Sequence, residues 1–177
     1  SCDRYYHAWR HGSVRTMGFL TIARVLAVVC AGLLAGIYLG YRAGAYYALQ
    51  KLGASSFVQF QQILHIRFMR FMPPLVLTSL LSALAWLLMV RAQGRSLEFW
   101  LITASAAGIA LIAAMTRAVN VPLNKKLMTF NVATPPSDLR EIWAPWDRVN
   151  TIRAILAVGV LILEAVALSL RTPIGRL

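Results

Sequence analysis

The sequence predicts an all-α integral membrane protein, a four-helix bundle with an additional interfacial helix in each of its two long connections. Hydrophobic residues make up 59% of the 177 residues and charged residues only 14%, whereas soluble domains average about 45–50% and 25%. The excess lies in four long apolar stretches, each near the roughly 20 residues that cross the hydrocarbon core of a bilayer. A chain of this length forms one membrane domain.

The elements follow from these stretches in order. We expect a polar, basic segment over 1–17, a membrane domain over 18–171, and a tail over 172–177. The four spans are expected at about 18–40, 73–91, 98–118 and 151–170. Basic residues before an apolar run resemble a signal peptide, but the run is too long for one, so we interpret it as a retained first span.

The first span carries glycines at a strict interval of four: Gly32, Gly36, Gly40 and Gly44. Positions four apart share one face of a helix, and small residues on that face let a second membrane helix approach closely. This face is expected to pack against another helix, from this chain, from a second copy or from another membrane subunit. Chance tolerance of glycine is the alternative.

The first long connection contains a candidate catalytic residue. A helix is expected from Ser55 or Ser56 to about Met72, with an apolar stripe that suits the membrane surface. The second span then begins at Pro73 and Pro74, since proline suits a first helical turn. Gln61 and His65 lie four apart and face the same way. A lone histidine is more often structural than catalytic, and both interpretations stay open.

Polar side chains also mark the end of the third span and the start of the fourth. Asn120 and Asn124 share a helical face, with Arg117 beside it, although Pro122 can bend the helix. Asp138 and Glu141 form a capping box. The residues after it are spaced by three, four and three, so they share one face unless Pro145 breaks the helix: Trp143, Trp146, Asn150 and Arg153. They predict either an interfacial aromatic belt or the mouth of a ring-lined pocket.

Two charged residues lie well inside the expected spans, away from the span ends. Arg24 is about a third of the way along the first and Glu164 is deep in the fourth. Charges in a membrane tend to pair or to face the interior. We expect an ion pair between Arg24 and Glu164, and the alternative is a carboxyl that handles protons.

The charge of the chain indicates its surroundings. The net charge is +12, but it is dispersed, which favours the lipid bilayer and its anionic headgroups as partner over nucleic acid. By the positive-inside rule, the short basic segments predict that both termini lie in the cytoplasm. The membrane is expected to be a bacterial inner membrane. Cys2 and Cys30 fit no disulfide framework or metal spacing. His7 and His11 lack further ligands, so no metal and no cofactor is expected.

Two motifs carry a family resemblance. The stretch N-V-P-L-N over Asn120–Asn124, followed by W-x-x-W-D-R-x-N-x-x-R over Trp143–Arg153, resembles a group of small four-span membrane proteins that includes the anthrone oxygenases of polyketide pathways. The resemblance covers about residues 18–170. It implies the four-helix fold, and the oxidation of an activated phenolic CH₂ by O₂ without metal or flavin.

That chemistry needs a base that makes a carbanion and donors that hold the developing oxyanion. The resemblance implies His65 as the base, with Gln61 beside it, and Arg117, Asn120 and Asn124 as the donors. Substrate would be bound by Trp143, Trp146, Asn150 and Arg153, with the tryptophans stacked on a flat ring system. The competing interpretation is a non-catalytic structural or accessory subunit of a larger membrane complex, docked through the glycine face.

Overall fold

The computed structural model describes the backbone of residues 2–92 and 94–170, and the side chains of residues 17–92 and 94–170. The described part is helical and contains no strand, which confirms the all-α prediction. The elements, of which η1 and η2 are single π-helical turns, are α1 Cys2–Gly40, η1 Tyr41–Ala45, α2 Tyr46–Lys51, α3 Ala54–Arg91, α4 Leu97–Met115, η2 Thr116–Asn120, α5 Val121–Leu127 and α6 Leu139–Ser169.

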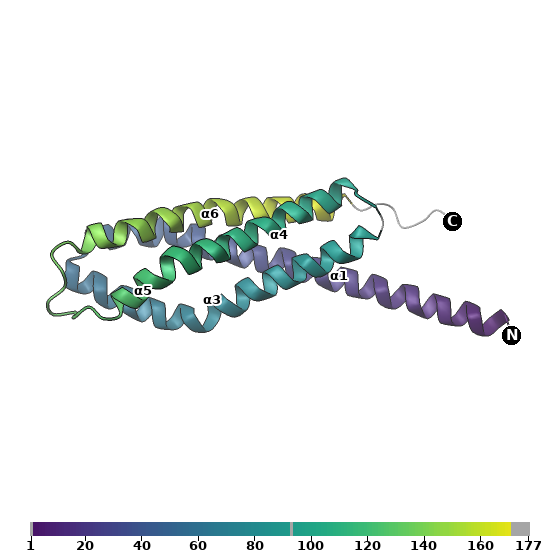
Figure 1. Cartoon of the computed structure of the whole chain (residues 1–177), viewed down its shortest axis with the longest axis horizontal. Helices are drawn as coiled ribbons and strands as arrows, with labels where there is room; N and C mark the ends of the chain where they lie inside the picture. The colour runs from purple at the N-terminus through teal and green to yellow at the C-terminus, as the bar shows by residue number, and fades with distance from the viewer. Residues whose placement is uncertain (1, 93, 171–177) are drawn as a thin grey trace.

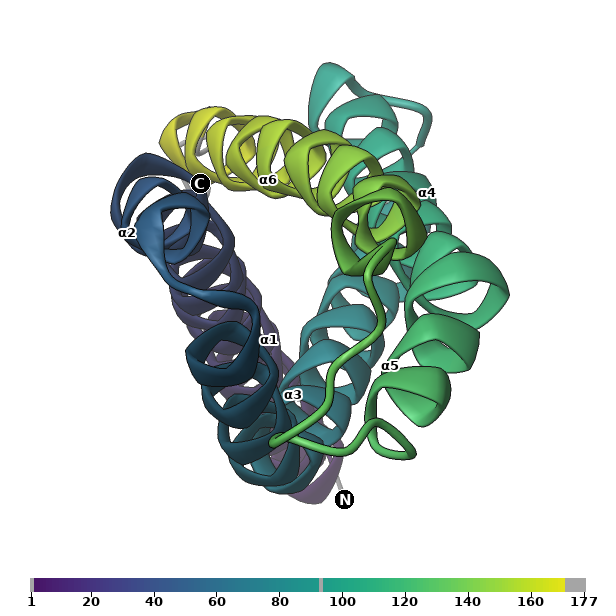
Figure 2. The same ribbon diagram turned by 90° about the vertical axis from the view of Figure 1, so that its left-hand side faces the viewer.

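Four helical units are long and apolar enough to cross a membrane: Met17–Lys51, Ala54–Arg91, Leu97–Leu127 and Leu139–Ser169. The predicted membrane bundle is therefore confirmed. The long helices alternate in direction and each packs against two neighbours, in the cyclic order α1, α3, α4, α6 (Figure 1; Figure 2). We call the end that holds η1, α2, α5 and the connection 128–138 the cavity end.

The separate interfacial helices expected in the long connections are not confirmed. Residues 54–72 form the first half of the continuous helix α3, which runs through Pro73 and Pro74 to Arg91. Likewise α6 runs from Leu139 through Pro145 into the fourth span. Proline's fixed φ is itself helical, and membrane helices tolerate proline where the freed backbone groups find other partners. The helix caps also differ from those expected. The N-cap of α3 is Gly53, which has no side chain, and not Ser55 or Ser56, and the N-cap Asp138 of α6 makes no side-chain capping bond.

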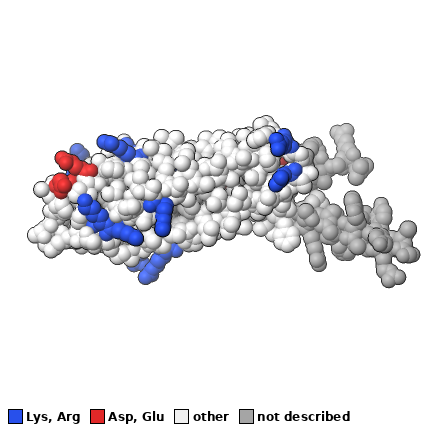
Figure 3. Space-filling model, viewed as in Figure 1, with Lys and Arg blue, Asp and Glu red and all other residues white. Residues whose placement is uncertain are grey.

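Helix α3 is longer than the hydrocarbon core is thick. Its 38 residues rise about 57 Å, against about 30 Å of hydrocarbon. Residues 71–90 carry no charge and are flanked by Arg70 and Arg91, and a helix of that length rises about 30 Å. The space-filling view shows charged side chains gathered toward the two ends, with an uncharged band between them (Figure 3). Residues 71–90 alone are therefore long enough to cross the hydrocarbon, and α3 is longer than one crossing requires.

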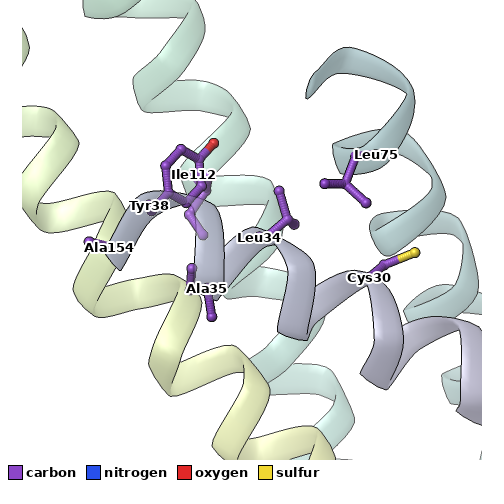
Figure 4. Packing of buried hydrophobic residues seen from close by; sticks show 8 residues of the cluster. Cys30, Leu34, Ala35, Tyr38, Leu75, Ile112 and Ala154 are labelled. Atoms are coloured by element: carbon purple, nitrogen blue, oxygen red, sulfur yellow. The ribbon is translucent and has the colours of Figure 1, made fainter. Parts of the chain in front are cut away.

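The inner face of α1 is built by alanine, leucine and tyrosine. Ala27 and Ala31 are fully buried. Further along, Leu34, Ala35 and Tyr38 join a core cluster with side chains of the other three long helices (Figure 4). Small alanine side chains let neighbouring helices approach closely, so alanine takes the role that the sequence assigned to glycine.

The glycine stripe is not confirmed as a packing face within the chain. A Cβ added at Gly32 would lie 3.8 Å from a methyl group of Leu161, whereas one at Gly36, Gly40 or Gly44 would meet nothing within 4 Å. These three glycines are exposed. The tightest glycine contact lies elsewhere, since a Cβ at Gly108 of α4 would come within 2.9 Å of Val160 Cγ2 in α6.

The expected ion pair between Arg24 and Glu164 is wrong. Arg24 Nη2 pairs with Glu98 Oε1, which also accepts a 2.7 Å hydrogen bond from Trp86 Nε1. Glu164 instead accepts a 2.7 Å bond from Ser105 Oγ and is fully buried. Ser105 lies seven residues beyond Glu98 on α4, about 10 Å along the axis. Glu164 is therefore about two turns too deep to reach the level of Arg24.

Candidate functional site

A cavity of about 450 Å³ lies within the bundle at the cavity end, with walls from α1, η1, α3, α4, η2, α5 and α6. Ligand sites typically occupy about 300–1,000 Å³ and are mostly apolar with a few polar groups. The apolar wall includes Ile37, Leu64 and Val76. All nine residues that the sequence proposed for catalysis or substrate binding also line it: Gln61, His65, Arg117, Asn120, Asn124, Trp143, Trp146, Asn150 and Arg153.

Three aromatic rings form one wall. Trp143 and Trp146 are stacked, with ring centroids 4.8 Å apart and planes inclined by 18°. Tyr41 meets Trp146 edge to face at 5.4 Å. Trp143 exposes only 2% of its surface, so it belongs to the interior of the bundle and not to a lipid-facing belt. The continuous helix α6 places both tryptophans on the cavity side.

Arg153 is the most firmly held polar side chain of the cavity. Its Nη1 donates to Thr116 Oγ1 at 2.9 Å and its Nη2 to Asn150 Oδ1 at 2.8 Å. Its Cζ lies 4.8 Å from the ring centroid of Tyr38 and 5.8 Å from that of Trp146. Arg153 Nε and Asn150 Nδ2 are buried and have no partner among the described residues. The wall of the cavity thus holds a fixed cation, and one N–H donor on Arg153 and one on Asn150 lack an acceptor among the described residues.

The two asparagines after the third span differ in their bonding. Asn124 Oδ1 accepts a 2.9 Å hydrogen bond from Trp146 Nε1, so it fixes the orientation of that ring. Asn120 Nδ2 donates a long bond of 3.5 Å to the Trp146 carbonyl. Asn120 is 1% exposed, and its Oδ1 has no partner among the described residues. Arg117, by contrast, is exposed at the rim of the cavity.

Gln61 and His65 occupy successive turns of α3 on the cavity side. The buried Gln61 Nε2 donates to Tyr41 Oη at 2.9 Å, which ties α3 to η1. His65 is half-buried. Its imidazole makes no side-chain hydrogen bond with any described residue, which disfavours a hydrogen-bonded structural role and leaves both ring nitrogens free to face a ligand.

Both π-helical turns lie against the cavity. Tyr41 opens η1, while Thr116 and Asn120 begin and end η2. A π-turn inserts one extra residue into a helical turn and is often found at functional sites. Thr116, Arg117 and Asn120 of η2 and Asn124 of α5 all line the same cavity.

Tyr38, Tyr41 and Thr116 are lining residues that were absent from the site proposed from the sequence. Tyrosines near the end of an apolar span are usually interfacial, so the sequence gives no sign that these two face inward. For Thr116, the spacing of four that it shares with Asn120 and Asn124 is the one sequence feature that indicates a place in the same site.

The cavity has an opening on the side of the bundle. The exposed members of its wall are Met69, Pro73 and Leu77 on α3, and Arg117 on η2. Leu77 lies seven residues beyond Arg70, about 10 Å further along the uncharged stretch of α3. The opening between α3 and η2 therefore extends from the level of the charged side chains into the uncharged band of the bundle.

Comparison with known families gives one match. A family described as anthrone oxygenase matches residues 60–163 of the 177. The chain belongs to this family. The matched range contains all nine proposed catalytic and substrate-binding residues, whereas α1 with Tyr38 and η1 with Tyr41 lie outside it. The chain is thus an anthrone oxygenase-like membrane protein. No curated protein and no solved structure matches it.

The sequence predicts no metal site, and the side chains that test this prediction are those of histidine, cysteine, aspartate and glutamate. Within the described residues, no group of three or more such side chains could hold a metal ion. Cys30 is a free, buried cysteine. The side chains of Cys2, His7 and His11 lie outside the described residues, so the absence of a bound metal or cofactor stays a prediction.

Proposed function

We propose that the protein is a membrane-embedded oxygenase that oxidises the activated CH₂ of a flat phenolic substrate without a bound cofactor. The observation that carries this proposal is the convergence of one free imidazole, a fixed guanidinium and a stacked tryptophan pair on a single apolar cavity. Membership of the anthrone oxygenase family supports the reaction class.

The proposed reaction begins with a proton transfer. A CH₂ group between two aromatic rings, conjugated through them with the carbonyl on the opposite side of the central ring, loses its proton to His65, and the negative charge is delocalised onto the carbonyl oxygen. The resulting electron-rich carbanion reduces O₂. Overall, CH₂ and O₂ give C=O and H₂O, so the methylene carbon loses two hydrogens, one oxygen atom enters the product and the other leaves as water.

The oxyanion requires donors that are in place before the charge develops. Arg153 Nε and Asn150 Nδ2 are buried and unpartnered among the described residues, and Arg153 is fixed by Thr116 and by the rings of Tyr38 and Trp146. We assign the oxyanion to this pair, with Asn120 nearby. Asn124 positions Trp146, and the more exposed Arg117 binds substrate at the rim. This assignment moves the donor role inward from the residues that the family resemblance implied.

The proposed substrate reaches the cavity from the bilayer. The wall residues Leu77 and Met69 are 56% and 52% exposed, and they flank an opening that lies partly at hydrocarbon depth. A flat aromatic molecule of low polarity partitions into lipid and can enter there. Once inside, it stacks against the rings of Trp143 and Trp146.

Oxygen consumption by purified protein tests the proposal. The protein is washed with a chelator, shown by its absorption spectrum to carry no flavin or haem, and mixed with anthrone and hydroxylated anthrones under ¹⁸O₂. We expect O₂ uptake above the spontaneous rate and one ¹⁸O atom in the new carbonyl group. Activity that returns only with added metal or flavin would contradict cofactor independence. No uptake over the whole substrate panel would favour the non-catalytic subunit.

A further inference from the structure

A second, polar cavity of about 280 Å³ lies at the cavity end between η1, α2 and the first turns of α6. We propose that it binds a phosphate group, such as the headgroup phosphate of an anionic lipid. The chemistry-bearing residues of its wall are Arg42, Tyr46, Gln50, Arg140, Asp147 and Arg148. The two cavities share Trp143 as a wall residue, but the phosphate proposal does not depend on the catalytic one.

The cavity holds more positive than negative charge. Three arginines, Arg42, Arg140 and Arg148, line it together with a single carboxylate, that of Asp147. Among the described residues the ion pair between Arg24 and Glu98 is the only one within 4.0 Å, so Asp147 pairs directly with none of the three. Arg42 Nη1 and Arg140 Nη1 are buried and have no hydrogen-bond partner in the described part of the chain. Two guanidinium groups therefore present N–H donors that lack an acceptor.

The two guanidinium groups are held in place by other contacts. Arg140 Nη2 donates to the carbonyl oxygens of Leu49 and Leu52 at 3.2 and 2.9 Å. Its Cζ also lies 4.3 Å from the ring centroid of Phe57. The Cζ of Arg42 lies 4.0 Å from the ring centroid of Tyr46. Because the two guanidinium groups are already ordered, their side chains lose little conformational entropy when a ligand binds.

The position of the cavity favours a lipid headgroup. Arg42 follows residues 25–41, which carry no charge, so it lies where the first span leaves the hydrocarbon. Charged side chains gather at this end of the bundle (Figure 3), and Tyr46 and Tyr47 suit the membrane interface. Planar guanidinium groups bind phosphate oxygens through paired hydrogen bonds, and anionic headgroups lie at this depth.

The test measures binding to the full chain purified in a neutral detergent. Short-chain phosphatidylglycerol, diacylglycerol with the same acyl chains, and sodium phosphate are titrated in parallel, and bound ligand is counted by native mass spectrometry. We expect phosphatidylglycerol to bind and diacylglycerol not to. The double variant Arg42→Gln/Arg140→Gln should weaken binding by about tenfold or more, since each arginine near a headgroup contributes roughly fivefold.

A matched variant separates the cavity from overall charge. Arg67→Gln/Arg70→Gln removes the same two charges from the exposed side of α3, outside both cavities, and should leave binding unchanged. Because the Arg140 variant also loses two structural hydrogen bonds, Asp147→Asn provides a second measurement. It removes the negative charge from the site, so binding should become several-fold tighter, a gain that misfolding cannot produce.

The outcomes distinguish the source of the phosphate. Binding of phosphatidylglycerol that inorganic phosphate does not displace supports a lipid headgroup. Displacement by inorganic phosphate at similar concentration supports the same site with free phosphate as its ligand. Equal weakening by both double variants, or equal binding of diacylglycerol, would overturn the proposal.

Discussion

Arg153 Nη1 donates a 2.9 Å hydrogen bond to Thr116 Oγ1, and this contact joins the middle of α6 to the first residue of the π-turn η2. Thr116 in turn donates to the Ile112 carbonyl at 2.7 Å. The π-turn, the buried guanidinium and the polar part of the cavity are thus one hydrogen-bonded unit, in which the hydroxyl of Thr116 is both acceptor and donor.

Replacing Thr116 by valine should destabilise the protein. Valine keeps the shape but leaves Arg153 Nη1 without its acceptor, and an unsatisfied buried donor costs about 1–3 kcal/mol. Thr103→Val is the matched control, because Thr103 Oγ1 makes only the equivalent 2.8 Å bond to the Phe99 carbonyl. Thermal unfolding in detergent should show a clear loss of stability for Thr116→Val. For Thr103→Val the free energy of unfolding should change by no more than about 0.5 kcal/mol. Equal losses would mean that the Arg153 contact contributes nothing.

Helical spacing was sufficient to predict the face of α6 that lines the cavity. Trp143, Trp146, Asn150 and Arg153 recur at intervals of three and four, which is one face of any continuous α-helix. Pro145 lies between them, but it does not end the helix. The spacing of Gln61 and His65 places both on one face of α3 for the same reason, and in the structure this face lines the cavity. The shared faces could be predicted because they depend only on local geometry, whereas the roles of the residues stay predictions.

Predictions that depend on how helices pack could not be made from spacing. Four glycines four apart define a face, but not what that face contacts, and the buried face of α1 is the one with Ala27 and Ala31. The partner of Arg24 depends on which acid lies at its depth. Glu98 sits in the first turn of α4, at the very end of the expected third span, and was therefore not considered as a partner. The π-turns have no composition signal, so the inward orientation of Tyr41 could not be predicted.

His65→Ala tests the proposed general base. Turnover with an anthrone substrate should fall by roughly 10²–10⁴-fold, the range for lost general-base catalysis. Because the half-buried imidazole makes no side-chain hydrogen bond with a described residue, the variant should remain monodisperse and unfold at nearly the wild-type temperature. Arg67→Ala, at an exposed position half a turn further along α3, should keep full activity. An active His65→Ala protein would eliminate His65 as the base, and an unfolded one would favour a structural role.

Leu77→Trp tests entry from the bilayer. A tryptophan at this exposed wall position should narrow the opening between α3 and η2, lowering kcat/KM for a lipophilic anthrone by about tenfold while leaving single-turnover chemistry of bound substrate intact. Leu81→Trp is the control, since Leu77 and Leu81 are equally exposed, at 56% and 55%, and only Leu77 lines the cavity. The rate should be measured with protein in lipid nanodiscs. If both variants slow the reaction equally, the substrate does not enter at this opening.

Glycine substitutions compare the packing expected from the sequence with the packing observed. On a tightly packed glycine face, Gly36→Leu would force helices apart, but Gly36 is exposed and a Cβ there meets nothing within 4 Å. We now expect Gly36→Leu to leave the unfolding temperature of the single chain unchanged. Gly108→Leu should lower it, because even a Cβ would lie 2.9 Å from Val160 Cγ2 and overpacking costs about 1–3 kcal/mol.

The same pair of variants tests whether the glycine face contacts a second chain. If another copy or a partner subunit packs there, Gly36→Leu should shift the protein to a smaller assembly in size-exclusion chromatography with light scattering, without altering the unfolding of the dissociated chain. Gly108→Leu should leave the size of the assembly unchanged and lower the unfolding temperature of the single chain, because its contact lies between α4 and α6 of one chain. A stable Gly108→Leu protein would contradict the close approach of these two helices.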